Sequence, residues 1–225
     1  MAQEMSVGRP AGIRALYEYH HERMNLPPEL SEDVAVNLSV QVLYRIATCD
    51  DGAKCRGGDH ILESLTARGV NMATSAILLC AAGLYDEALN SVRSLGEIAN
   101  LFGFLWLYPE KYSDWVMATK KRRKAEFSPS AIRKAIEAKD GYLSPMDQET
   151  YTRLCELATH VHGATAPNAY GEDGRRHVGG FEQAEGVRYV AEQLSNVVVM
   201  LAMFASKMVG RDDLFDEVVK SVRDT

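Results

Sequence analysis

Hydrophobic residues recur along this chain with a helical period nearly throughout. No segment alternates strictly between apolar and polar residues, as a half-buried strand would. Between residues 32 and 48, one buried helix face is indicated by apolar side chains four positions apart: Val34, Leu38, Val42 and Ile46. The pattern predicts an all-α fold, a single-domain helical bundle of about eight helices spanning residues 1–225.

Prolines, glycines and capping residues indicate where these helices begin and end. Ser31 and Ser144 are the expected N-caps of two helices, and Pro145 suits the first turn after Ser144. Pro27 and Pro28 set residues 1–28 apart as a candidate N-terminal appendage. The stretch AGLYDEA joins two long helices into a central antiparallel hairpin. We expect helices over residues 11–24, 32–48, 60–82, 86–108, 110–126, 144–162, 181–209 and 212–222, and a short one after residues 128–130.

Composition limits the classes of function. A formal net charge of -6 argues against a surface that is basic all over, as in a general nucleic-acid-coating protein, but leaves room for a local basic patch. Apolar runs such as residues 197–205 are far shorter than the roughly 20 residues of a membrane span, so we expect no membrane contact. Without a signal peptide or CxxC spacing, the four cysteines are expected to be free thiols in the cytoplasm: Cys49, Cys55, Cys80 and Cys155.

The stretch THVHGATAPNAYGEDGRRHVGG, residues 159–180, contains three of the six histidines and five glycines. It is either a polar surface loop or part of a site in which Arg175, Arg176 and His177 wrap an anion. His160 and His162 are two positions apart at a helix end, where their side chains diverge, and His177 follows much later in the chain. This spacing suits zinc poorly, so we expect no metal.

Two stripes of polar residues lie on predicted helices. The first, in helix 144–162, consists of Glu149, Arg153, Glu156 and His160, with an apolar flank of Tyr151, Leu154, Leu157 or Ala158, and Val161. The second, in helix 86–108, consists of Asp86, Asn90, Arg93, Glu97 and Asn100. Each stripe is either a set of solvated or half-buried ion pairs, or one wall of a shared pocket. In the second interpretation, Arg93 and Glu97 bind a ligand beside His160 and His162.

Five consecutive cations, KKRRK at residues 120–124, are followed by Arg133 and Lys134. They are either a solvated helix end or a binding surface for RNA or DNA phosphates. The candidate binding residues are Lys120, Lys121, Arg122 and Arg123. The chain has no Walker A sequence, no GxGxxG after a strand, no HExxH and no GxSxG. We therefore expect no cofactor.

Residues 83–115, with the sequence RSLGE, and residues 151–163, which end in VHG, resemble a group of uncharacterised microbial helical proteins. That group is similar to the HEPN superfamily (higher eukaryotes and prokaryotes nucleotide-binding domain), whose members are all-α bundles that often dimerise. Many are metal-independent ribonucleases of toxin–antitoxin and phage-defence systems, with four to six residues between an Arg and a His. Arg153 and His160 match this spacing. The resemblance implies that the histidine transfers a proton and that the arginine stabilises negative charge on phosphorus.

These observations leave three functions open. The most specific is a nucleotide- or RNA-binding homodimer, with metal-independent cleavage by Arg153, His160 and His162. The others are a non-catalytic protein-interaction bundle and a bundle that binds a small ligand between helices 86–108 and 144–162.

Overall fold

The computed structural model describes residues 13–22, 24–49, 60–159, 180 and 183–223, and every regular element in this part of the chain is helical. The all-α fold class is therefore confirmed. The helices are α1 (Ile13–His21), α2 (Pro28–Ser31), α3 (Val34–Thr48), α4 (Ile61–Ala81), α5 (Tyr85–Leu107), α6 (Lys111–Val116), α7 (Lys120–Glu126), α8 (Pro129–Glu137), α9 (Gln148–Leu154), α10 (Ala184–Met208) and α11 (Asp212–Arg223). A π-helical turn, Cys155–Thr159, continues α9.

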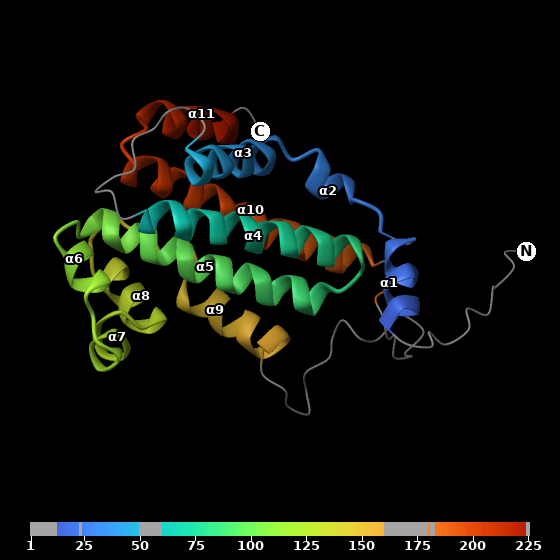
Figure 1. Cartoon of the computed structure of the whole chain (residues 1–225), viewed down its shortest axis with the longest axis horizontal. Coiled ribbons are helices and arrows are strands. Elements are labelled where there is room, and N and C mark those ends of the chain that lie inside the picture. Colours follow the sequence, from blue (N-terminus) through green and yellow to red (C-terminus); the bar gives the residue numbers. More distant parts are fainter. Residues whose placement is uncertain (1–12, 23, 50–59, 160–179, 181–182, 224–225) are drawn as a thin grey trace, which may run out of the picture.

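The predicted hairpin is the centre of the bundle (Figure 1). Helices α4 and α5 are antiparallel neighbours, and Gly83 provides the left-handed conformation, φ 72°, that the tight turn between them requires. Helix α10 packs along both, with α3 and α11 on its other side. Helices α8 and α9 lie on the remaining face of α5. Only one side of α5 therefore faces the short helices α8 and α9, and the polar stripe of α5 lies on that side.

The core contains fully buried side chains from the long helices, among them Leu43, Leu89, Leu95, Phe102, Leu194 and Leu201. Helix α10 is long and apolar enough to cross a membrane by length and composition. Of its most apolar stretch, however, 56% is buried inside the molecule, as in the core helix of a bundle. The absence of membrane contact stays a prediction.

Three sequence-based boundaries are corrected. Asp33, and not Ser31, caps α3, because its carboxylate accepts a hydrogen bond from the Val36 N–H at 2.9 Å. The buried face of α3 is displaced accordingly: Val34 is 58% exposed, while Ala35 and Leu43 are buried.

The expected helix 110–126 is divided into α6 and α7. Thr119 caps α7, and the change of direction places Phe127 against Phe104 of α5, with ring centroids 6.1 Å apart. Short segments of this kind raise the number of helices above the eight expected.

The third correction concerns the start of α9, which Asp147 caps instead of Ser144. The reason is a clamp on the preceding residue. The Asn100 side chain accepts from the Met146 N–H at 3.0 Å and donates to the Met146 carbonyl at 2.8 Å. With both backbone groups engaged by a side chain of α5, Met146 cannot join a helix.

Candidate functional site

The polar stripe of α5 meets α9 in a hydrogen-bonded cluster. Arg93 Nη1 donates to Glu97 Oε1 at 2.6 Å and to the Tyr151 hydroxyl at 3.0 Å. The Tyr151 hydroxyl in turn donates to the same Glu97 oxygen at 3.0 Å. The Arg93 side chain is 16% exposed and that of Glu97 33%. Two donors, one from each helix, thus share the partly buried Glu97 oxygen as their acceptor, as the ion-pair interpretation of this stripe predicts.

Electrostatics hold Arg93 and Tyr151 in their usual charge states. Burial acts to lower the pKa of Arg93, but the Glu97 carboxylate, Tyr151 and Cys155 together outweigh it and leave that pKa above the ordinary value. The pKa of Tyr151 is also raised, first by burial and then by the negative charge of Glu97. The phenol therefore stays neutral and remains a donor at physiological pH.

A second guanidinium lies against the same tyrosine. Arg133 of α8 is only 2% exposed, and its Cζ stands 3.9 Å from the centre of the Tyr151 ring, within the range of a cation–π contact. Its Nε and Nη2 donate to the Gln148 side-chain oxygen at 3.3 and 3.0 Å, whereas its Nη1 is buried without an acceptor. We call the set Arg93, Glu97, Arg133, Gln148 and Tyr151 the arginine–tyrosine cluster.

Sequence reasoning missed three members of this cluster, and Gln148 was not among its candidate residues at all. Tyr151 was assigned to the apolar flank of its helix, and Arg133 was noted only as a cation after the basic run. The hydroxyl of Tyr151 was a usable signal, since a buried tyrosine normally directs its O–H at a polar partner. For Arg133 the chain offers no local signal, because its partners Gln148 and Tyr151 lie on another helix.

Two further polar residues of the α5 stripe also point at the α9 side. Asn100 clamps Met146, and Asn90 accepts a hydrogen bond from the Thr159 hydroxyl at 3.2 Å. Arg93, Asn90 and Asn100 thus pair with Tyr151, Thr159 and a backbone segment.

That second stripe faces elsewhere. Glu149, Arg153 and Glu156 are exposed, and the Arg153 guanidinium lies over the Tyr189 ring of α10, 4.9 Å from its centre. The Tyr189 pKa is raised, first by burial, so this ring too remains neutral. The partners that the sequence suggested for Arg153, His160 and His162, lie outside the described residues, as do Arg175, Arg176 and His177.

The basic run forms α7 and divides into paired and unpaired cations. Arg122 bonds Glu126 and Asp114, and Arg123 Nε donates to the Ala118 carbonyl at 3.0 Å. The hydrogen bond from Arg122 lowers the pKa of Asp114, so this pair persists in mild acid. Three exposed lysines of the same helix have no ion-pair partner among the described residues: Lys120, Lys121 and Lys124.

The structure separates α7 from the histidine end of α9. Phe127, just after α7, packs on Phe104 of α5, whereas Thr159 is bonded to Asn90 near the start of α5. At 1.5 Å per residue these two points are about 21 Å apart along the α5 axis. In Figure 1, α7 and the last turn after α9 accordingly lie at different places along α5. A single small ligand cannot touch both, but an extended polyanion can.

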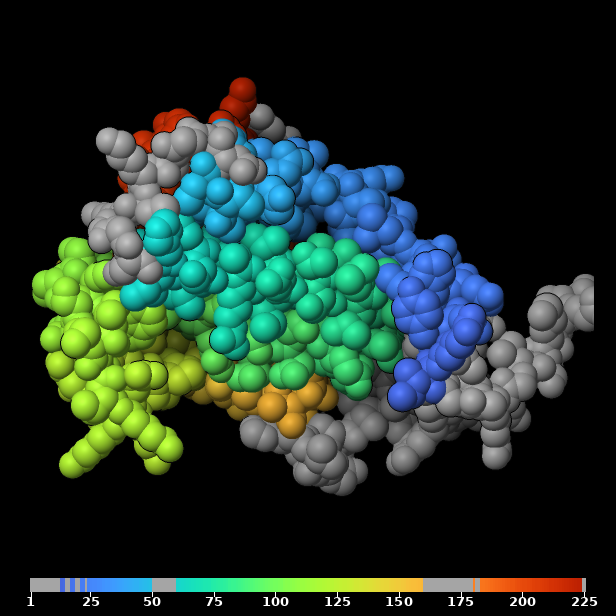
Figure 2. Space-filling model, in the orientation of Figure 1, coloured from blue at the N-terminus to red at the C-terminus, as the bar shows by residue number. Residues whose placement is uncertain are grey.

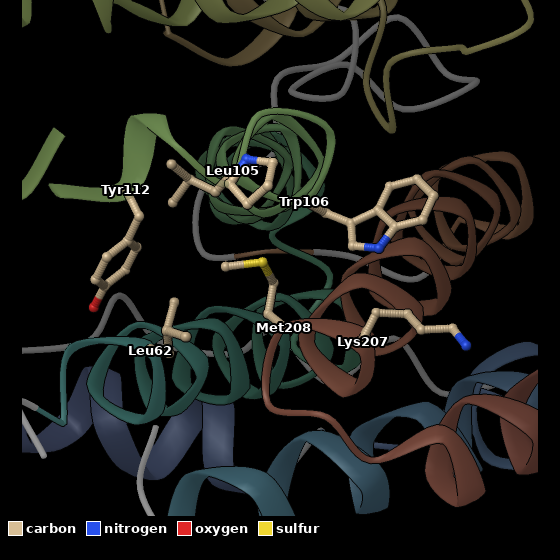
Figure 3. A pocket seen from close by; sticks show the side chains of 7 residues that line it. Leu62, Leu105, Trp106, Tyr112, Lys207 and Met208 are labelled. Atoms are coloured by element: carbon tan, nitrogen blue, oxygen red, sulfur yellow. The ribbon is translucent and has the colours of Figure 1, made fainter. Parts of the chain in front are cut away.

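Among the cavities lined by described residues, two open between helices elsewhere. One, of about 460 Å³, is lined mainly by apolar side chains, including Leu62, Trp106, Tyr112 and Met208 (Figure 3). The Lys207 amine at its edge is engaged by Asp212, at 2.6 Å. The other, of about 500 Å³, lies between α3, α10 and α11, where Val199, Met200 and Met203 face it. Neither includes a residue of the arginine–tyrosine cluster.

No group of three or more histidine, cysteine, aspartate or glutamate side chains within the described ranges could hold a metal ion. Cys80 and Cys155 are free and buried, and burial raises the pKa of the Cys80 thiol to about 12, which keeps it protonated and unreactive. No family model, curated protein or solved structure matches the chain.

Proposed function

We propose that this protein binds RNA, or a nucleotide, through the surface formed by α7 and the start of α8. The observation that carries the proposal is the concentration of charge there. Apart from the buried Arg133, residues 120–134 contain six cations and one carboxylate, in a chain whose formal net charge is -6. Such a local excess attracts phosphates and releases their counterions. Lys120, Lys121 and Lys124 are exposed and free of ion pairs within the described part of the chain, which leaves them available to phosphates.

The position of this surface at one end of the molecule supports the proposal. Helices α6 to α8 form one end of the bundle in Figure 2, and long side chains project from it into solvent. Phosphate contacts by flexible lysines place a nucleic acid without reading its sequence. The protein is therefore expected to bind single-stranded RNA with little preference for sequence.

Cleavage is the more specific form of the proposal. Arg153 is exposed, so its guanidinium is open to an RNA phosphate, and its Tyr189 neighbour holds the guanidinium in place. With His160 as the proton-transfer group, RNA lying along the bundle from α7 would reach Arg153. A cytoplasmic location, a homodimeric state and a role in defence or in a toxin–antitoxin pair belong to the same proposal.

Fluorescence polarisation of labelled single-stranded RNA tests the binding surface. We expect Lys120→Gln/Lys121→Gln to weaken binding by about tenfold. The matched control is Lys139→Gln/Lys220→Gln, which removes the same charge from exposed lysines elsewhere and should leave affinity nearly unchanged. Equal losses in the two double variants would reduce the effect to net charge and reject the α7 surface.

Cleavage of the same RNA in EDTA tests the catalytic form. We expect the wild type to cleave, and Arg153→Ala, His160→Ala and His162→Ala to lose activity while their circular dichroism is unchanged. A folded wild type that binds RNA but leaves it intact would restrict the function to binding.

A non-catalytic protein-interaction role is the second candidate, and one surface favours it. Trp106 and Tyr142 are in contact, with ring centroids 5.8 Å apart, and each is 37% exposed. The neighbouring Leu143 is 84% exposed. Tryptophan and tyrosine are enriched at the energetic centres of protein interfaces. A wild type that fails to bind RNA would move the proposal to this surface.

A further inference from the structure

We propose that Arg133, at the junction of α8 and α9, is the binding site for one phosphate group, and that the Gln148 side chain covers the site until the anion binds. This inference concerns a single small anion inside the arginine–tyrosine cluster. It does not depend on RNA binding at α7.

The first argument is a charge balance. Arg133 is 2% exposed, and none of the ion pairs of the described residues includes it. The one carboxylate of the cluster, Glu97, already accepts from Arg93 and from Tyr151. A buried charge is costly unless it is paired, so the cluster carries one uncompensated positive charge that an anion would neutralise.

The second argument is the way in which Gln148 contacts the guanidinium. Its single side-chain oxygen accepts from both Nε and Nη2, the edge that carboxylates and phosphates bind with two parallel hydrogen bonds. A neutral amide oxygen thus occupies the position that an anionic oxygen would bind more strongly.

The third argument is that the cover can be removed without unfolding. Gln148 is exposed at the first position of α9, and beyond Arg133 the one side-chain partner it has among the described residues is the Thr152 hydroxyl, at 2.9 Å. Rotation of this one side chain would open the Nε–Nη2 edge to solvent. Tyr151 would meanwhile hold the guanidinium from its ring face.

The fourth argument is the unused donors. Arg133 Nη1 and Arg93 Nε are both buried without a hydrogen-bond partner. A buried N–H without an acceptor is rare and costs free energy, so these donors add to the cost of the uncompensated positive charge that an anion would offset.

Isothermal titration calorimetry of the full chain with inorganic phosphate tests the proposal, with sodium acetate as the second arm. We expect phosphate to bind the wild type and to bind Gln148→Ala at least as tightly, because that variant lacks the cover. Arg133→Lys keeps the charge but lacks the pair of parallel N–H donors that binds an anion in a bidentate manner, so its affinity for phosphate should fall by about tenfold. Tighter binding of acetate than of phosphate would overturn the choice of ligand.

The decisive variant is Gln148→Glu, which changes an exposed residue and should fold. It places a carboxylate on the Arg133 edge, so phosphate binding should disappear while the melting temperature without ligand rises. Ser130→Glu adds the same charge at an exposed position of α8 and is the matched control, in which phosphate should still bind. Absence of phosphate binding by the wild type, or unchanged binding by Gln148→Glu, would overturn the proposal. RNA binding at α7 is measured separately, so either result can fail alone.

Discussion

At the scale of single residues, Asn100 occupies a buried position that requires a side chain with both a hydrogen-bond donor and an acceptor. It is 1% exposed, and its amide satisfies both backbone groups of Met146 across 46 residues of sequence. A side chain with one donor and one acceptor is needed there, because the clamp replaces two backbone hydrogen bonds. Its function is to fix where the 138–147 connection returns to α5, and hence where α9 begins.

We expect Asn100→Ala to lower the free energy of unfolding by about 2–4 kcal/mol, since it leaves a buried N–H and a buried carbonyl without partners. Urea unfolding followed by circular dichroism measures the loss. Asn90→Ala is the control on the same stripe. Asn90 is exposed, so its replacement should change stability by no more than about 0.5 kcal/mol. Similar losses in the two variants would contradict the importance of the clamp.

Tyr151 makes the stability of the folded protein depend on pH in the alkaline range. The pKa of Tyr151 is raised in the folded state. Its contribution to the free energy of unfolding is therefore fully present below the pKa of an unfolded tyrosine, about 10. It is lost as the pH rises through the higher folded pKa. The stability difference between the wild type and Tyr151→Phe should therefore shrink above about pH 10.

Chemical denaturation at a series of pH values checks this expectation. Tyr44→Phe, at a position that is 55% exposed, is the matched control and should show no such trend relative to the wild type. A stability difference for Tyr151→Phe that is constant through the alkaline range would contradict the assigned environment.

At the scale of elements, contacts between the long helices depend on glycines at their closest approach. Gly186 of α10 faces Tyr85 of α5, and a Cβ at this position would lie 2.6 Å from a ring carbon. The ring is held in place: Tyr85 is 2% exposed, and its hydroxyl accepts from the Gln183 N–H at 2.9 Å. At Gly69 of α4, the nearest atom is instead a terminal methyl of Leu201, which can rotate.

These two glycines predict different outcomes for the same substitution. Gly186→Ala should destabilise the protein by about 1–3 kcal/mol, because a rigid ring must move. Both positions are helical, so alanine gains about 1 kcal/mol of helix propensity over glycine at each. Gly69→Ala should cost less because only a methyl must rotate. Thermal unfolding of both variants measures the difference. A Gly69→Ala protein less stable than Gly186→Ala would show that the α4–α10 contact is the tighter one.

The helix boundaries show how much of the fold could be predicted from the sequence. Periodicity located α4, α5 and α10 to within a few residues, because each long helix has its own apolar stripe. It misplaced the start of α9 because the controlling residue, Asn100, is on another helix. It also joined α6 and α7, since the break at residues 117–119 is set by how Phe127 packs on α5.

At the scale of the whole molecule, charge is distributed unevenly. Residues 120–134 are strongly basic, so the rest of the chain is more acidic than the net charge of -6 indicates. Opposite charges at different places orient a polyanion on approach and oppose its binding elsewhere. This distribution makes RNA affinity depend on salt through the α7 lysines.

Each lysine that contacts a phosphate of single-stranded RNA contributes about 0.7 to the slope of log affinity against log salt. Lys120→Gln/Lys121→Gln should therefore reduce the magnitude of that slope by about 1.4. Polarisation titrations at a series of salt concentrations measure it. The Lys139→Gln/Lys220→Gln protein should retain the wild-type slope, and a slope that changes equally in both would contradict phosphate contacts by α7.

The sequence by itself determined the all-α class, the central hairpin, the long helices and the basic run, because each depends on residues close together in the chain. Only the tertiary structure decided which polar groups meet. It paired Arg93 with Tyr151 and stacked Arg133 on the same ring, while Arg153 was placed against Tyr189 on the surface. The physical reason is that such contacts depend on the rotation and offset of one helix against another. Those are set by packing of the whole core and by clamps such as Asn100, and not by the spacing of residues within a single helix.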